Sequence, residues 1–316
     1  MPAFHHLINA ILVVVGIYAV AIVLRSRGVL KEEHSMILAR IVTDVSLPAV
    51  VFVSLASHAL RPDQVEPAFV MLGLELLFIG LAWVISSKFG FSRAQQGAIV
   101  FCSAFGSSTF LGYSIVQQMY PDTPRAMSEA VLISEIGVGY PIFILGPILA
   151  AYFGSKKLGK SNWKSSLSFF RSPVFFAMIA GLLWSILKLP GKENLYIAPV
   201  FHFGSVLSAA LTPLAILAVG LMLKKISIRT ILLPLSIVIL LKLLLKPLLA
   251  GFAATQFEFP DMWKQLLVLM AAMPSAVLGV VFLRRYGGDA TLASALLLTA
   301  TILSSFTLIG VFWLVG

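Results

Sequence analysis

The chain has 316 residues, of which 59% are hydrophobic and only 11% are charged, and its mean hydropathy is +0.99. Soluble domains contain roughly 45–50% apolar and about 25% charged residues, so this chain has too few polar side chains to cover a soluble surface. The composition excludes a cytosolic enzyme, a disordered chain and a disulfide-rich scaffold, since Cys102 is the single cysteine, and it predicts an integral membrane protein.

Ten apolar runs follow one another along the chain. They do not alternate in polarity as barrel strands would, so we expect an all-α protein with ten transmembrane helices. In chain order the runs are Leu7–Leu24, Met36–Ser57, Ala68–Ile85, Gln96–Gln118, Met127–Phe153, Pro173–Leu187, Tyr196–Leu223, Ile231–Thr255, Trp263–Arg284 and Ala290–Val315. The first run is longer than the apolar core of a signal peptide and follows no basic segment, so we expect it to be retained.

The basic residues indicate an orientation in the membrane. Of the 23 lysines and arginines, 16 lie in or beside the odd-numbered loops and five in or beside the even-numbered loops. Positively charged loops stay in the cytoplasm, so both termini are expected outside, in a bacterial inner (plasma) membrane. Because topology explains most of the net charge of +10, no nucleic-acid partner is expected.

The two halves of the chain resemble each other. The basic segment 156–171, a predicted cytoplasmic linker, separates residues 1–155 from residues 172–316, and each half carries five predicted helices. Pro48 recurs as Pro213 at a shift of 165 residues, and Gly112 recurs as Gly279 at a shift of 167. Five is an odd number, so the halves would insert with opposite topology, which is typical of secondary transporters.

The fourth and ninth predicted helices are interrupted at corresponding places. Gly106 and consecutive hydroxyl residues break the fourth, and Pro274 breaks the ninth. Such a pair predicts two broken helices that cross near the membrane midplane and hold the substrate, whereas an ordinary proline kink is the alternative. The candidate substrate-binding residues are Ser107, Ser108, Thr109, Tyr113, Pro274 and Ser275.

Asp44 lies one turn after Arg40 near the cytoplasmic end of a predicted span, which predicts an interface ion pair between them. Four other ionisable residues lie deep inside predicted spans, namely Glu75, Glu135, Lys242 and Lys246. Buried charges in a membrane are costly and commonly functional. Three of them fall about 12 Å below the outer boundary and Lys242 about 18 Å below, at 1.5 Å per residue. The four groups could therefore neutralise one another, either as a charge and coupling site or as a structural cluster. The five histidines show no paired metal spacing, and no catalytic motif occurs in context, so we expect no metal, no cofactor and no enzyme.

Three segments resemble the auxin efflux carrier family of permeases, and the resemblance covers essentially the whole chain. They are IVTDVSLPAVVFVSLA, AFGSSTFLGYSIVQQMYPD and AAMPSAVLGVVFLRRYGGDATLASALLLTATILSSFTL, of which the last is the most specific. The resemblance implies a scaffold of helices 1, 2, 6 and 7 with a homodimer contact, and a mobile transport unit of helices 3–5 and 8–10. It also implies organic anions as substrates, such as auxins or dicarboxylates.

The chain departs from the family pattern in the fourth helix. Where the family shows an Asn-Thr-Gly-Phe-Leu-Gly-x-Pro run, this chain has Ser107 in place of the asparagine and Ser114 in place of the proline. A serine hydroxyl has one donor where an amide has two, so the polar atoms offered at position 107 differ from those of the family.

These patterns together predict a secondary active transporter of small organic anions with elevator-type alternating access, coupled to H⁺ or Na⁺ or to neither. The lipid bilayer and a second copy of the chain are its expected partners. One alternative is a symporter or antiporter of the bile acid:sodium symporter type, which shares the plan of crossing helices. The other is a channel or sensor that retains the fold without active transport.

Overall fold

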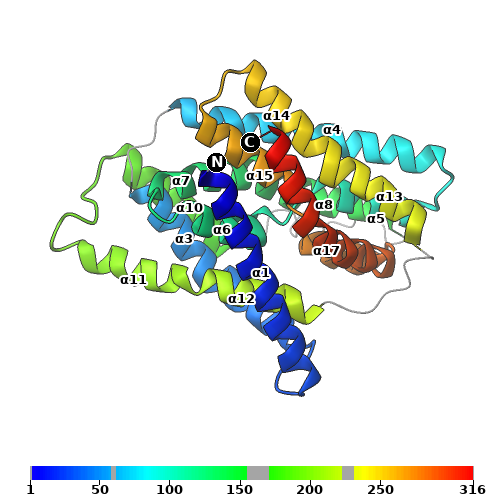
Figure 1. The fold of residues 1–316 in the computed structure, drawn as a ribbon, viewed down its shortest axis with the longest axis horizontal. Helices are drawn as coiled ribbons and strands as arrows, with labels where there is room; N and C mark the ends of the chain where they lie inside the picture. The colour runs from blue at the N-terminus through cyan, green and yellow to red at the C-terminus, as the bar shows by residue number, and fades with distance from the viewer. Residues whose placement is uncertain (1, 58–61, 155–170, 223–230, 316) are drawn as a thin grey trace. The chain divides into compact units, whose positions relative to one another are not determined.

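The computed structural model describes residues 2–57, 62–154, 171–222 and 231–315. These residues form helices joined by short turns, and within them the only β-type pairing is an isolated antiparallel bridge between Gly106 and Ser275. The predicted all-α class is confirmed for this part of the chain (Figure 1).

Seven helical stretches are long and apolar enough to cross a membrane, as an integral membrane protein requires. They are Ile8–Ser26, His34–Ala56, Glu66–Lys88, Arg125–Phe153, Ala198–Leu221, Leu232–Gln256 and Ala290–Trp313. Each corresponds to one predicted helix, with ends that differ by a few residues.

In the described residues, the other three predicted spans contain only shorter helices. The sixth is the 14-residue α10 (Pro173–Ile186). The fourth is divided into α5 (Arg93–Ala104), the π-helical η3 (Ser108–Gly112) and α6 (Tyr113–Met119). The ninth is divided into α15 (Asp261–Ala272) and α16 (Val277–Tyr286). The interruptions fall where Gly106 and Pro274 predicted them.

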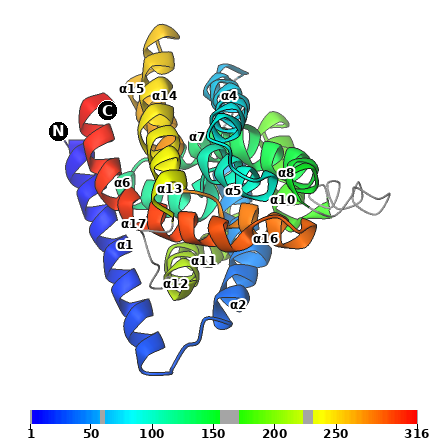
Figure 2. The same cartoon turned by 90° about the vertical axis from the view of Figure 1, so that its right-hand side faces the viewer.

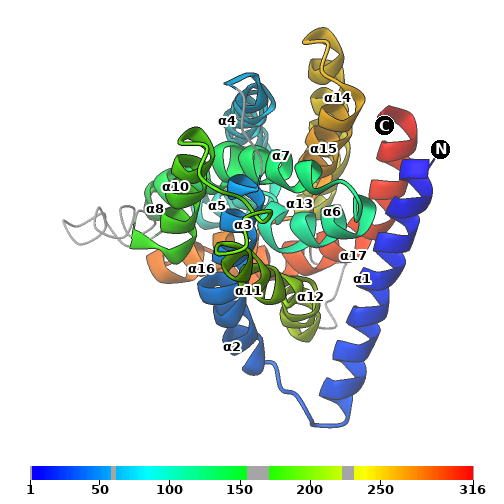
Figure 3. The same ribbon diagram turned by 90° about the vertical axis from the view of Figure 1, so that its left-hand side faces the viewer.

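The chain forms two compact units. Unit 1 comprises residues 1–64, 109–131 and 170–223. Besides α6, α10 and the first part of α7 (Pro124–Ser134), it contains α1 (Pro2–Ser26), α2 (His34–Ile41), η1 (Val42–Ser46), α3 (Leu47–Ala56), η2 (Pro62–Val65), α11 (Ala198–Ala209) and α12 (Leu211–Met222). Within this unit α10 and α11 both pack against α3 (Figure 3), and α12 packs against α1 and α2.

Unit 2 comprises residues 65–108, 132–169 and 224–316. Besides α5, α15 and α16, it contains α4 (Glu66–Lys88), η4 (Glu135–Gly139), α8 (Tyr140–Phe153), α13 (Leu232–Val238), η7 (Ile239–Leu245), α14 (Lys246–Gln256) and α17 (Ala290–Val315). Within this unit α14 lies beside α15 and α4 (Figure 2), and α17 contacts α5, α15 and α16.

Three of the π-helical segments end two residues before a proline. The pairs are η1 with Pro48, η4 with Pro141 and η7 with Pro247. A proline within a helix has no N–H to donate, and its ring collides with the carbonyl four residues earlier. The wider π turn relieves that collision while the helix continues. Glu135 and Lys242 consequently lie on turns whose geometry a proline has altered.

The predicted ion pair between Arg40 and Asp44 is confirmed. Arg40 Nε lies 3.9 Å from Asp44 Oδ2, and both side chains are exposed. The predicted linker 156–171 lies outside the described residues except for Arg171, as do the basic residues at 224, 225 and 229.

Two glycines allow close packing around α3 in unit 1. A Cβ atom added at Gly204 of α11 would lie 2.5 Å from Val53 Cγ2, and one added at Gly181 of α10 would lie 2.9 Å from Leu55 Cβ. Small residues permit such close helix contacts in membranes, where dispersion rather than the hydrophobic effect drives association.

We expect Gly204→Val and Gly181→Val each to lower the free energy of unfolding by about 1–3 kcal/mol, because the added side chain has no room. Gly16→Val on α1 is the matched control, since a Cβ there meets no atom within 4 Å. Thermal unfolding of the purified protein in detergent measures the effect. Equal melting temperatures for Gly204→Val and Gly16→Val would contradict the packing.

Candidate functional site

The two interrupted helices of unit 2 meet at their breaks. The backbone is extended at Phe105 (φ −79°, ψ 127°) and again at Ala276 (φ −79°, ψ 132°). The N–H of Ser107 donates to the carbonyl of Pro274 at 2.7 Å, and the N–H of Ala276 donates to the carbonyl of Phe105 at 2.9 Å. We call the paired segments 105–107 and 274–276 the helix crossing. Each segment thus provides hydrogen-bond partners for backbone N–H and C=O groups of the other. Without them these groups would be unpaired, because the hydrocarbon of a membrane offers no donors or acceptors.

Two fully buried lysines bind the helix ends beside the crossing. Lys242 Nζ donates to the carbonyls of Ala104 and Ala271, both at 3.3 Å. Lys246 Nζ donates to the same Ala104 carbonyl at 2.8 Å. These carbonyls lie at the C-terminal ends of α5 and α15. Each such end carries roughly half a negative charge, so the ammonium groups stabilise both.

Gly106 makes room for the Lys242 ammonium. A Cβ atom at Gly106 would lie 2.8 Å from Lys242 Nζ. A larger residue there would displace the ammonium from the two carbonyls. The glycine that the sequence marked as a helix breaker therefore also has a packing role.

Glu75 on α4 completes the buried cluster. Its Oε1 lies 2.6 Å from Lys246 Nζ, and neither side chain is exposed. Its second oxygen, Oε2, has no hydrogen-bond partner among the described residues. The charges of the two lysines are thus opposed by one carboxylate and by two helix C-termini, which leaves the cluster close to neutral.

The contacts of Lys242 involve residues that the predicted shift between the two halves of the sequence relates to each other. The shift of 167 residues relates Ala104 to Ala271, which are the two carbonyls that Lys242 binds. The same shift relates Glu75 on α4 to Lys242 on η7. Glu75 and Lys242 thus carry opposite charges at corresponding positions of the two halves. Lys242 Nζ binds corresponding carbonyls, one from each half, at the same distance.

The predicted hydroxyl residues of unit 2 bond to the protein itself. Ser275 Oγ donates to the carbonyl of Cys102 at 2.8 Å. Ser108 Oγ lies 2.7 Å from Ser134 Oγ. Both hydroxyls are buried at the crossing, as is Ser107. These hydrogen bonds hold the interrupted segments in place.

Two other predicted residues belong to unit 1, namely Thr109 and Tyr113. Tyr113 is fully buried at the start of α6. The nearby Ser114 donates its hydroxyl to the carbonyl of Phe110 at 2.7 Å. Ser114 stands two residues after η3, where prolines follow the other π segments. Its hydroxyl binds the carbonyl that a proline at this position would have left unbonded.

Glu135 lies on η4 in unit 2 and is buried. A Cβ atom at Gly139 would lie 2.9 Å from its Oε2, so the carboxylate lies along its own helix. The ion pair of Lys246 is made with Glu75. The predicted depths allowed the four charges to neutralise one another but did not specify which pairs form.

Glu129 was not singled out in the sequence, although it is fully buried in α7 of unit 1. Gln64 Nε2 donates to its Oε1 at 2.6 Å, and Arg125 Nε lies 3.4 Å from the same oxygen. The i, i+4 spacing of Arg125 and Glu129 at the start of a predicted span was the available signal.

We expect Glu75→Leu to destabilise the protein by about 3–5 kcal/mol, because it leaves the Lys246 ammonium buried without its carboxylate. The double variant Glu75→Leu/Lys246→Met should recover most of that loss, since it removes both charges. Thermal unfolding in lipid nanodiscs measures both effects, and Glu193→Gln in a surface loop is the control. A double variant as unstable as Glu75→Leu would contradict the pairing.

Comparison with known proteins gives one consistent result. A family model described as "Membrane transport protein" matches residues 6–312. An uncharacterized transporter of Methanocaldococcus jannaschii is 27% identical over 302 residues, which cover 93% of each chain. An uncharacterized transporter of Methanothermobacter thermautotrophicus is 26% identical over 95% of each chain. The uncharacterized transporter YfdV of Escherichia coli is 23% identical over 86% of this chain and 87% of its own.

Proposed function

Because the chain belongs to the membrane transport protein family of the auxin efflux carriers, we propose that it is a secondary active transporter of small organic anions. The observation that carries this proposal is the helix crossing with Lys242 bound to the ends of both interrupted helices. Family and relatives point to transport rather than to catalysis.

The charge distribution at the crossing favours an anion. The carbonyl ends of α5 and α15 are negative and are already neutralised by Lys242 and Lys246. The N-terminal end of α16, which begins at Val277 just after the crossing, is positive. A carboxylate at this end would gain the helix dipole and could exchange hydrogen bonds with Ser275 or Ser108.

The division of the chain supports an elevator mechanism. Unit 1 contains predicted helices 1, 2, 6 and 7, which the family resemblance assigns to the scaffold. It also contains residues 109–131, from predicted helices 4 and 5, which the resemblance assigns to the transport unit instead. Unit 2 contains the helix crossing and all four predicted buried charges. Movement of such a unit would carry the crossing from one side of the membrane to the other.

The same geometry bears on the coupling ion. In transporter folds with discontinuous helices, carbonyls at the C-terminal ends of half-helices coordinate a cation. Here a lysine ammonium binds those carbonyls, so the proposed transport does not need sodium. Glu75 Oε2 is an acceptor without a partner among the described residues, and it is the proposed position for a coupling proton.

Uptake into proteoliposomes tests the site. We expect Lys242→Met to lower the uptake of labelled malonate or indole-3-acetate at least about tenfold, because the crossing loses a charge balanced against both helix ends. Ser108→Ala and Ser275→Ala should lower uptake less. Lys88→Gln, which changes an exposed lysine at the end of α4, is the control. Full uptake by a well-folded Lys242→Met protein would refute the site.

Ion replacement separates the proposal from its rivals. Uptake should be unchanged when sodium is replaced by choline at constant pH, since a lysine stands where the cation would bind. Dependence on a sodium gradient would favour a symporter of the bile acid:sodium symporter type. Substrate binding without counterflow between labelled and unlabelled substrate would favour a channel or sensor.

A further inference from the structure

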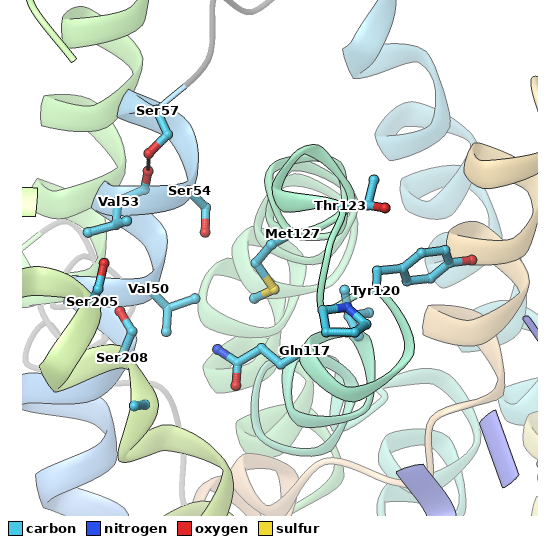
Figure 4. A pocket seen from close by; sticks show the side chains of 13 residues that line it. Val50, Val53, Ser54, Ser57, Gln117, Tyr120, Thr123, Met127, Ser205 and Ser208 are labelled. Atoms are coloured by element: carbon cyan, nitrogen blue, oxygen red, sulfur yellow. Dashed lines mark hydrogen bonds between the residues drawn. The ribbon is translucent and has the colours of Figure 1, made fainter. Parts of the chain in front are cut away.

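Unit 1 contains a cavity of about 360 Å³ that the sequence did not indicate. It lies between α3 and α11 on one side and the segment from α6 to α7 on the other. Figure 4 shows Val50 and Ser54 of α3, with Ser208 of α11, opposite Gln117 and Met127. All its lining residues belong to unit 1.

The lining is neutral. It contains no Asp, Glu, Lys, Arg or His, and its walls are largely apolar, with Val50, Val53, Val116 and Met127 among them. Its one titratable side chain is Tyr120, whose pKa is raised by burial to about 12. The phenol therefore stays uncharged. Met127 shares α7 with Glu129, whose carboxylate is paired with Arg125.

Three serine hydroxyls in this lining have already used their hydrogen. Ser57 donates to the carbonyl of Val53 at 2.6 Å. Ser205 and Ser208 donate at 2.8 Å to the carbonyls four residues before them in α11. A hydroxyl has one donor and two lone pairs. These serines therefore offer acceptors to anything that enters the cavity.

The complementary donor is the side-chain amide of Gln117. Its Oε1 accepts a hydrogen bond from Thr212 Oγ1 at 3.0 Å. This bond orients the amide, and its NH₂ group is directed toward α3 and α11 (Figure 4). The cavity thus combines an apolar wall with neutral donors and acceptors.

We propose that this cavity is a binding site for an uncharged, largely apolar small molecule bearing a carboxamide or a protonated carboxyl group. The carbonyl of such a group would accept from Gln117 Nε2, and its N–H or O–H would donate to a serine Oγ. A carboxylate has no N–H or O–H for the serines and meets no cation in the lining, so its desolvation is not compensated. The site is separate from the proposed anion site at the crossing and does not rest on it.

Calorimetric titration of the full chain in detergent, with phenylacetamide and phenylacetic acid as probes, tests this site. The amide should bind equally at about pH 7.5 and about pH 4.5, whereas the acid should bind at least about tenfold more weakly at the higher pH, because a carboxyl titrates near pH 4. Lowering the pH should bring the affinity of the acid toward that of the amide.

Variants assign the binding to the cavity. Gln117→Leu and the double variant Ser205→Ala/Ser208→Ala should each weaken amide binding about tenfold. Ser236→Ala is the control, since this hydroxyl bonds to Leu232 in the same way but on α13. Lys242→Met should bind the amide normally, whatever its effect on uptake. Failure of the amide to bind, equal binding of acid and amide at the higher pH, or normal binding by Gln117→Leu would overturn the proposal.

Discussion

A helix that is interrupted within a membrane exposes backbone groups that hydrocarbon cannot satisfy. In unit 2 the two interrupted helices satisfy each other through the bonds of Ser107 and Ala276, and Lys242 of η7 and Lys246 of α14 bind the carbonyls at their ends. Other features follow from this requirement. Gly106 must lack a side chain so that the ammonium can approach, and Glu75 must be present because Lys246 would otherwise be a buried charge without a carboxylate.

The two units meet the same constraint with different chemistry. Unit 2 buries charges that balance one another around the helix crossing. In unit 1 the cavity is lined by hydroxyls that bond to their own helices, such as Ser205 and Ser208, and by a neutral amide. A charged ligand is suited to the helix crossing of unit 2, where helix dipoles and lysines can stabilise its charge. An uncharged ligand is suited to the cavity of unit 1, whose lining has no charged side chain to compensate for desolvation.

Much of the local architecture could be predicted, because its signals are local. Long apolar runs, Gly106 and Pro274 indicated the spans and their interruptions, and the i, i+4 spacing indicated the Arg40–Asp44 pair. The pairing of the buried charges could not be predicted. Their depth suggested a common cluster, but the packing of the helices determines which side chains on different helices come into contact. Glu129 lies near the start of a predicted span, and its full burial and its bond from Gln64, 65 residues earlier in the chain, depend on packing that the sequence does not show.

The sequence by itself determined that the chain is an α-helical membrane protein of the auxin efflux carrier family and where its helices break. These properties depend on hydropathy, on proline and glycine, and on family motifs, all of which act within short segments. Only the tertiary structure decided that Lys242 binds two helix ends, that Lys246 pairs with Glu75, and that a neutral cavity lies in unit 1. These contacts join residues far apart in the chain, and their energies depend on distance and burial, which periodicity and depth along one helix do not specify.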